Sequence, residues 1–168
     1  MKLIYSPDPW LEKKLPEFDF DQYDATELSN NMIDIMQSNN GIGLSANQVG
    51  IDGQIFVMKP HLLTDNSVLT VINPTIESVT VNMNTAREGC LSHPNLWLDI
   101  KRPRGLNIKY LDILGKECII ELYDIDARCF LHEYDHLQGI EFIDRVSKLK
   151  LQMAKKKLLK LNKKEKEW

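Results

Sequence analysis

The sequence predicts an α+β protein, in which small antiparallel β-sheets pack around a central helix, with one further helix near each end of the chain. Two observations predict this class. Apolar residues recur at helical spacing in three separate segments, and the region between the first two segments holds short β-type runs. No helical pattern separates successive runs, and strands joined without a crossover helix pair antiparallel.

Length and composition are typical of one globular domain. The chain has 168 residues, of which 43% are hydrophobic and 27% charged, enough to bury a core without disulfides. Its three cysteines are an odd number at no disulfide-framework spacing, which favours a reducing compartment. The net charge of -3 gives no overall attraction to nucleic acid or membranes, and no run approaches the roughly 20 apolar residues of a membrane span. We expect a cytoplasmic monomer.

The first helix is expected over residues 25–39, with Thr26 as its cap and Gly41 just past its end. Six short strands should follow, at residues 54–58, 68–72, 75–81, 96–100, 106–111 and 118–122. Prolines interrupt this region, and a proline cannot donate a hydrogen bond to a neighbouring strand. Several of these strands should therefore be sheet edges or broken pairs.

The central helix, from Asp124 as its expected cap to a left-handed turn at Gly139, carries the most informative pattern of the chain. His132 and His136 stand one turn apart on the same face and can bind one metal ion, with Glu133 beside them. Buried histidines and acids are costly without partners, and a metal ion supplies one. This is the metal-binding helix of the predicted fold, although the bare motif also allows two satisfied core histidines.

Two histidines leave the coordination sphere of a metal ion incomplete. Glu133 neighbours a ligand and can reach a water held by the ion, which suits a general base. Glu141 and Asp144 follow the helix too closely for the commonest spacing of a third ligand. A cysteine upstream of the helix must therefore be considered.

Two further segments are unusual. Residues 41–48 place small residues around the amide side chain of Gln48, and glycine there lets the backbone approach a ligand closely. Residues 88–92 read Glu-Gly-Cys-Leu-Ser, with Cys90 directly after a glycine. Taken alone, the first segment could be any turn and the second any buried thiol.

With these three motifs in this order, the chain resembles the peptide deformylases. That family carries a glycine-rich motif ending in glutamine, then Glu-Gly-Cys-Leu-Ser, then His-Glu-x-Asp-His. The resemblance extends from Ser6 to Arg145 and implies a catalytic domain over residues 1–146. It implies Cys90 as the third metal ligand, beside the two histidines, with water at the fourth position. The family commonly uses Fe(II) and accepts zinc, nickel or cobalt, and this ligand set suits all four.

The resemblance also implies the reaction. The enzyme would hydrolyse the formyl group from the N-terminal formylmethionine of newly made polypeptides and release formate. Glu133 would transfer the proton, while the side-chain amide of Gln48 and the backbone N–H of Leu91 would donate to the carbonyl oxygen. A metallopeptidase that cuts internal bonds, and a non-catalytic binder of formylmethionine or of ribosomes, are the competing functions.

Five residues are implied to bind the substrate. Gly43 and Gly89 would let the peptide lie along the protein as an added strand. Ile42, Ile125 and Cys129 would line the pocket for the methionine side chain. From sequence alone, Ile42 and Ile125 are as readily explained as core residues.

Four positions depart from the family pattern. Leu131 stands where a glutamine usually precedes the first metal histidine. Ser45 stands where an alanine is usual, Arg128 where an apolar pocket residue is common, and His93 where an apolar residue follows the cysteine motif. We expect Arg128 to make the pocket mouth more polar and His93 to lie at the pocket rim. Glu88 and Arg102 are expected to form an ion pair that steadies the cysteine segment.

Residues 147–168 should form a basic C-terminal helix that belongs to the same domain. An apolar stripe should dock it on the body of the protein, formed by Leu151, Ala154, Leu158 and Leu161. Its lysines are Lys148, Lys150, Lys155, Lys156, Lys157, Lys160, Lys163, Lys164 and Lys166. They form either a solvated face or, as similar deformylases imply, a contact with the ribosome.

Overall fold

The computed structural model describes residues 1–62 and 67–165, with side chains described up to residue 161. Its elements confirm the α+β class. Among these residues the α-helices are α1 (Ala25–Ser38), α2 (Asp124–Leu137) and α3 (Lys148–Glu165). The strands are β1 (Gly43–Ser45), β2 (Ile55–Met58), β3 (Leu69–Val79), β4 (Met83–Cys90), β5 (His93–Pro103), β6 (Gly105–Leu111) and β7 (Glu117–Tyr123).

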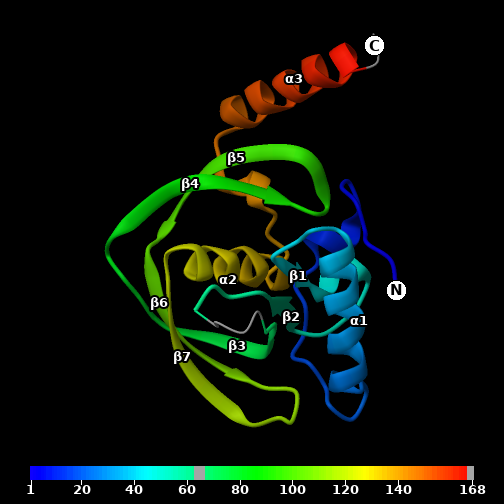
Figure 1. Cartoon of the computed structure of the whole chain (residues 1–168), viewed down its shortest axis with the longest axis vertical. Helices are drawn as coiled ribbons and strands as arrows, with labels where there is room; N and C mark the ends of the chain where they lie inside the picture. The colour runs from blue at the N-terminus through cyan, green and yellow to red at the C-terminus, as the bar shows by residue number, and fades with distance from the viewer. Residues whose placement is uncertain (63–66, 166–168) are drawn as a thin grey trace.

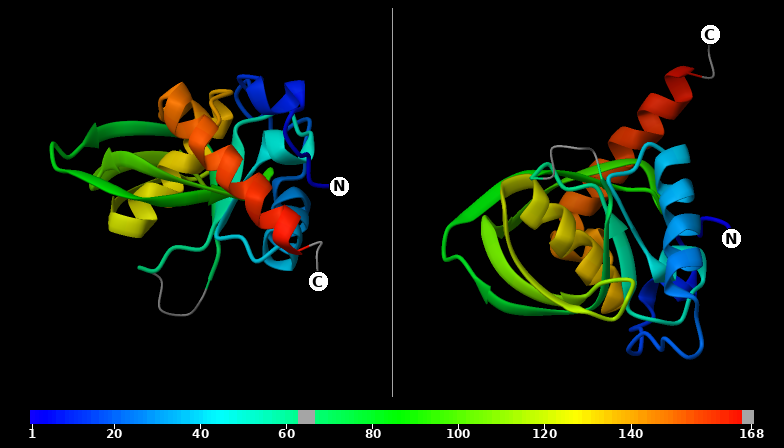
Figure 2. Two further views of the ribbon diagram at one scale, coloured as in Figure 1. Left: turned by 90° about the horizontal axis from the view of Figure 1, so that it is seen from above. Right: turned by 60° about the horizontal axis from the view of Figure 1, so that its bottom comes forward.

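Two antiparallel sheets enclose α2 (Figures 1 and 2). The larger sheet has the strand order β1-β2-β3-β6-β7, and the smaller one is the pair β4-β5. Helix α2 contacts strands of both sheets, whereas α1 packs on β1 and β2. Helix α2, which carries the two histidines, thus contacts both sheets.

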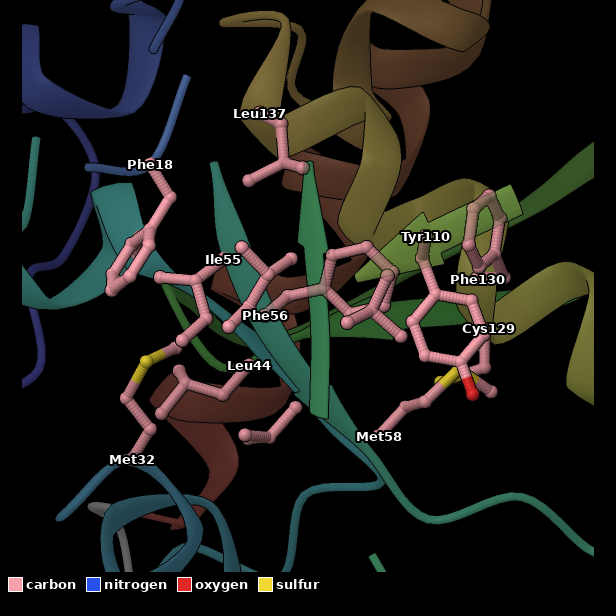
Figure 3. Packing of buried hydrophobic residues seen from close by; sticks show 14 of the residues in the cluster. Phe18, Met32, Leu44, Ile55, Phe56, Met58, Tyr110, Cys129, Phe130 and Leu137 are labelled. Carbon is pink, nitrogen blue, oxygen red and sulfur yellow. The ribbon is translucent and has the colours of Figure 1, made fainter. Parts of the chain in front are cut away.

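Aromatic packing attaches α2 to the larger sheet. Phe130 of α2 meets Phe56 of β2 edge to face, with ring centroids 5.3 Å apart, and both side chains are fully buried (Figure 3). Such a pair adds about 0.5–1.5 kcal/mol to the stabilisation from burial alone. Because residues two apart on a helix are separated by about 200°, the packing of Phe130 turns His132 toward the smaller sheet.

The prediction of separate strands at 68–72 and 75–81 is wrong, because β3 runs through both segments. Pairing between β3 and β6 is irregular between Ile72 and Thr75, and Asn73 has a positive φ of 47°. A bulge at this point accommodates Pro74 without ending the strand.

Two strands were not predicted. β1 and β4 are glycine-containing or polar segments with little intrinsic β-propensity, and each is stabilised by the partner strand it pairs with. The glycine-rich segment is thus a strand over Gly43–Ser45 and a 3-10 helix over Ala46–Val49, and Cys90 of the cysteine segment is the last residue of β4. The strand expected at 96–100 also extends over His93–Pro103.

The two predicted helix caps, Thr26 and Asp124, are wrong, and the predicted turn at Gly139 is confirmed. Asp24, not Thr26, caps α1, since its carboxylate accepts the N–H groups of Thr26 and Glu27 at 2.9 Å. Asp124 makes no side-chain cap for α2, because its carboxylate pairs with Arg104 instead. Gly139 ends α2 with a φ of 70°, as predicted.

Helix α3 packs along β5 (Figure 1). Leu151, Ala154 and Leu158 contact the apolar cluster that includes Phe142, while Leu161 is half exposed. The side chains of Lys163, Lys164 and Lys166 lie outside the described residues, and the boundary at residue 147 stays a prediction. No helix in the described part of the chain is long and apolar enough to cross a membrane.

Candidate metal centre

The end of β4 and one face of α2 bring three metal-binding atoms together. The sulfur of Cys90 lies 3.2 Å from Nε2 of His136, and the ligand atoms of Cys90, His132 and His136 all lie within 4.8 Å of one another. Two ligands of a tetrahedral ion, at about 2.0–2.3 Å from it, are about 3.5 Å apart. The three residues predicted as ligands are thus close enough to hold one ion.

His136 has the properties that a metal ligand needs. Burial lowers the pKa of its imidazole well below the usual value, and the nearby charges of His132 and His93 lower it further. The ring is therefore neutral and has a free electron pair to donate. Its Nδ1 is buried and finds no hydrogen-bond partner among the described residues.

Glu88 orients the other imidazole. Its Oε2 lies 3.1 Å from Nδ1 of His132, while Nε and Nη2 of Arg102 donate to its two oxygens at 2.7 and 2.9 Å. The Glu88–Arg102 ion pair is thus present as predicted. Burial alone would raise the pKa of Glu88, but the hydrogen bond from His132 and the Arg102 guanidinium lower it to about 2. This carboxylate therefore stays charged and fixes the ring that it contacts.

Two neighbouring groups, Cys90 and Glu88, change the pKa of His132. Burial would lower the pKa of this imidazole, but the sulfur of Cys90 and the carboxylate of Glu88 raise it to about 10. Both groups favour positive charge at this position, and a divalent cation would satisfy the same preference.

Arg128 lines the cavity, but as a buried, paired guanidinium and not as a charge exposed at the mouth. It is buried, and its Nη1 donates to Glu88 at 2.5 Å and to the carbonyl of Ile100 at 2.9 Å. Its charge is thus compensated in the wall of the cavity, where Glu88 accepts hydrogen bonds from two guanidinium groups at once.

Glu133 is held between β1 and the metal-binding atoms. The Ser45 hydroxyl lies 2.8 Å from its Oε2 and 2.9 Å from its backbone oxygen, so it can donate to either. A Cβ on Gly43 would lie 2.4 Å from Oε1 of Glu133, so this position has no room for a side chain. Burial raises the pKa of Glu133, although His132 and the Ser45 hydroxyl oppose the rise. A raised pKa brings a carboxylate closer to the range in which it can accept and return a proton near neutral pH.

The amide of Gln48 has a fixed orientation. Its Oε1 accepts the backbone N–H of Ser45 at 2.9 Å, which leaves Nε2 to donate toward Cys90 at 3.4 Å and Ser92 at 3.1 Å. A donor therefore stands beside the metal-binding sulfur.

A cavity of about 620 Å³ opens over these groups. Its lining includes all of the predicted catalytic and substrate-binding residues: Ile42, Gly43, Gln48, Gly89, Leu91, Ile125, Cys129 and Glu133. Ile42 and Ile125 are 46% and 42% exposed, so they are pocket residues and not core residues. Burial raises the pKa of the Cys129 thiol well above its usual value, so the group stays protonated and lines the pocket as a small apolar side chain.

Comparison with known proteins identifies the family. The family model described as polypeptide deformylase matches residues 1–152. The chain belongs to the polypeptide deformylase family. Among individual relatives, it is 45% identical to a peptide deformylase of Microchaete diplosiphon over 123 residues, covering 71% of this chain and 65% of the relative. It is 35% identical to peptide deformylase 1B of Arabidopsis thaliana over 165 residues, covering 98% of this chain and 60% of the relative.

The fold agrees with solved deformylase structures. A structure of a Synechococcus elongatus peptide deformylase in complex with actinonin superposes with a TM-score of 0.86 at 35% identity, covering 93% of this chain and 86% of that one. The chain spans less than two thirds of the length of the first curated relatives that it matches, 65% and 60% in the two cases above.

Three residues around the cavity have contacts that the sequence did not predict. His93 lines the cavity as expected of a rim residue, but it is buried and its Nε2 lies 2.5 Å from Oε2 of Glu141. Trp97 and Arg87 lie on the outer face of the smaller sheet and also line the cavity. These residues come together through the pairing of β4 with β5, and no short sequence motif predicts that pairing.

Proposed function

We propose that this chain is a metal-dependent hydrolase that removes the formyl group from N-terminal formylmethionine of newly made polypeptides and releases formate. The observation that carries the proposal is the convergence of Cys90, His132 and His136 beside the buried carboxylate of Glu133. Membership in the polypeptide deformylase family supports the same reaction.

The donor set fits one divalent ion. Cys90, His132 and His136 would hold it at the side of the cavity. When bound, such an ion lowers the pKa of water and so supplies a nucleophile at neutral pH. One thiolate and two imidazoles suit Fe(II), which we propose as the ion used in the cell, and also zinc, nickel and cobalt.

Two donors would stabilise the negative charge that develops on the formyl oxygen. Gln48 directs its Nε2 to the sulfur side of the site, and the backbone N–H of Leu91 follows the ligand Cys90 in the chain. Loss of one such donor typically raises the barrier by about 3 kcal/mol.

Glu133 would carry the proton. Its carboxylate accepts a proton from the attacking water and returns it to the leaving amine, so that the C–N bond breaks to give formate and a free N-terminus. The Ser45 hydroxyl and the absence of a side chain at Gly43 hold this carboxylate in place.

The peptide would bind as an added strand against Gly43 and Gly89, with the methionine side chain in the cavity. Ile42, Ile125 and the protonated thiol of Cys129 provide its apolar lining.

The lysine face of α3 is proposed to contact ribosomal RNA. Lys155, Lys156 and Lys160 are exposed, while Leu151 and Leu158 of the same helix pack on the protein. Exchanging these three lysines for glutamine should weaken ribosome binding and reduce its salt dependence. Unchanged binding at several salt concentrations would contradict this contact.

The reaction is tested by formate release. The protein is purified anaerobically, its metal content is measured, and formylmethionyl and unformylated peptides are supplied to the wild type and to Glu133→Gln. We expect formate from the formylmethionyl peptide and not from the unformylated one, with a rate about 10²- to 10⁴-fold lower in Glu133→Gln than in the wild type at equal metal content. Glu77→Gln, the same change at an exposed position of β3, is the control. No formate from metal-replete wild type would refute the proposal, and cleavage of internal bonds would favour a metallopeptidase.

A further inference from the structure

A second groove lies beside the metal cavity, on the outer side of the smaller sheet. It measures about 290 Å³ and runs between the sheet and α3. Its floor includes Arg87 and Trp97, and its α3 wall includes Lys157 and Leu161. The groove and the metal cavity share the lining residues Arg87, Asn95, Leu96 and Trp97.

Trp97 connects the two spaces. It pairs across the sheet with Gly89, and a Cβ on Gly89 would lie 3.1 Å from the indole ring. Because Gly89 has no side chain, the ring can lie over it and reach the edge of the metal cavity. Trp97 is nevertheless 52% exposed, so its indole offers an aromatic surface to a peptide that extends from the cavity along β4.

The charges of the groove are predominantly positive. The Arg87 guanidinium lies over the Trp97 ring, 5.2 Å from its centroid, and Lys157 stands on the opposite wall. Asp99 is the acidic residue among the lining residues described, and it pairs across the sheet with Arg87. Two cations thus face one carboxylate, which leaves a positive balance.

A peptide added along β4 would alternate its side chains between two faces of the sheet. On β4 itself, Glu88 is buried toward α2, whereas Arg87 is exposed on the outer face. A formylmethionine side chain directed toward α2 and Cys129 therefore places residue 2 of the substrate on the outer face, residue 3 on the inner face and residue 4 on the outer face.

We propose that this groove is a subsite for residues 2 and 4 of the formylated substrate, and that Arg87 and Lys157 give it a preference for acidic side chains. The inference rests on the proposed deformylase function and adds a sequence preference to it. Trp97 provides the apolar surface between the cavity and the two cations.

The test uses amidated formylmethionyl tetrapeptides that carry one glutamate or one lysine at position 2, 3 or 4, with alanine elsewhere. An ion pair at a partly exposed site should raise kcat/KM for the glutamate peptide by up to about fivefold. Repulsion between lysine and the two cations should lower kcat/KM for the lysine peptide, which increases the ratio of the two values. At low salt we expect kcat/KM for glutamate to exceed that for lysine by about tenfold at position 2 or 4, and by less at position 3. The ratio should fall as salt is added.

Substitutions assign the preference to the groove. Arg87→Glu should invert the ratio at the preferred position, Lys157→Gln should reduce it, and Asp99→Asn should increase it. Lys101→Gln removes an exposed charge from the outer face of β5 beyond the groove, and should leave the ratio unchanged. Since the two peptides share the same reacting end, their ratio cancels changes in metal content or in the chemical step.

Failure of the subsite and failure of the deformylase activity give different results. Formate release with equal kcat/KM for glutamate and lysine peptides, or a preference that Arg87→Glu and Lys157→Gln leave intact, would overturn the subsite while the deformylase activity stands. Absence of formate from every peptide would overturn both.

Discussion

Replacing Arg102 by alanine tests whether its buried ion pair with Glu88 stabilises the metal centre. Arg102 is 4% exposed, donates to both oxygens of Glu88 and places Nη1 2.8 Å from Asp135. Breaking a buried ion pair typically costs 3–5 kcal/mol. Glu88 would keep Arg128 and Asp135 would keep Arg145, so we expect a loss near the lower limit, about 3 kcal/mol. For a chain of this length that lowers Tm by about 6–12 °C.

The same substitution should weaken metal binding. With one of its two guanidinium partners lost, Glu88 no longer holds Nδ1 of His132 firmly, and the loss of such an orienting contact typically costs 10- to 100-fold in affinity, so we expect about tenfold. Denaturant unfolding of the metal-free protein and competition with a chelator measure the two effects. Arg104→Ala is the matched control, because Arg104 also binds a carboxylate, that of Asp124, but on the surface. Equal stability and metal affinity in the two variants would refute the reasoning.

Three further changes follow from the same site. Gly43→Ala should reduce formate release on the order of 100-fold at unchanged metal content, because its Cβ would displace the Glu133 carboxylate; an undiminished rate would contradict this. Ser45→Ala removes the buried hydroxyl beside Glu133 and should lower the free energy of unfolding by about 1–2 kcal/mol, measured with denaturant. The pKa of Glu88 is lowered from 4.5 to about 2, so its contribution to stability, about 3 kcal/mol, is present above pH 4.5 and lost as pH falls toward 2. Acid unfolding should therefore be less steep in Glu88→Gln than in the wild type.

Segments with a strong periodic pattern were predicted well. The spacing of apolar residues predicted α1 and α2, and the β-branched runs predicted β2, β6 and β7, each within a residue or two of its observed ends. β1 and β4 were missed because glycine and polar residues carry no local β signal, and these strands form only when a partner strand is present. Pro74 was read as a strand boundary, whereas the long pairing of β3 with β6 continues across it through a bulge.

The site was predictable to the extent that its residues are neighbours in sequence. His132 and His136 lie one helical turn apart, so the motif alone predicts a shared metal ion. Cys90 lies far from both in the chain, and its role was implied by resemblance and not by spacing. The buried position of Arg128 on α2 was not predictable, because it depends on an ion pair with Glu88, which lies on β4.

Residues close together along the chain were sufficient to predict the helix that carries the histidines, the strand-forming runs and the three motifs that place the chain in its family. Tertiary structure decided what lies between distant segments: the approach of Cys90 to His136, the clustering of two guanidinium groups on Glu88, and the groove that Trp97 joins to the cavity. The physical reason is that helical and strand periodicity are local properties, whereas sheet pairing and the desolvation of charges depend on which surfaces meet.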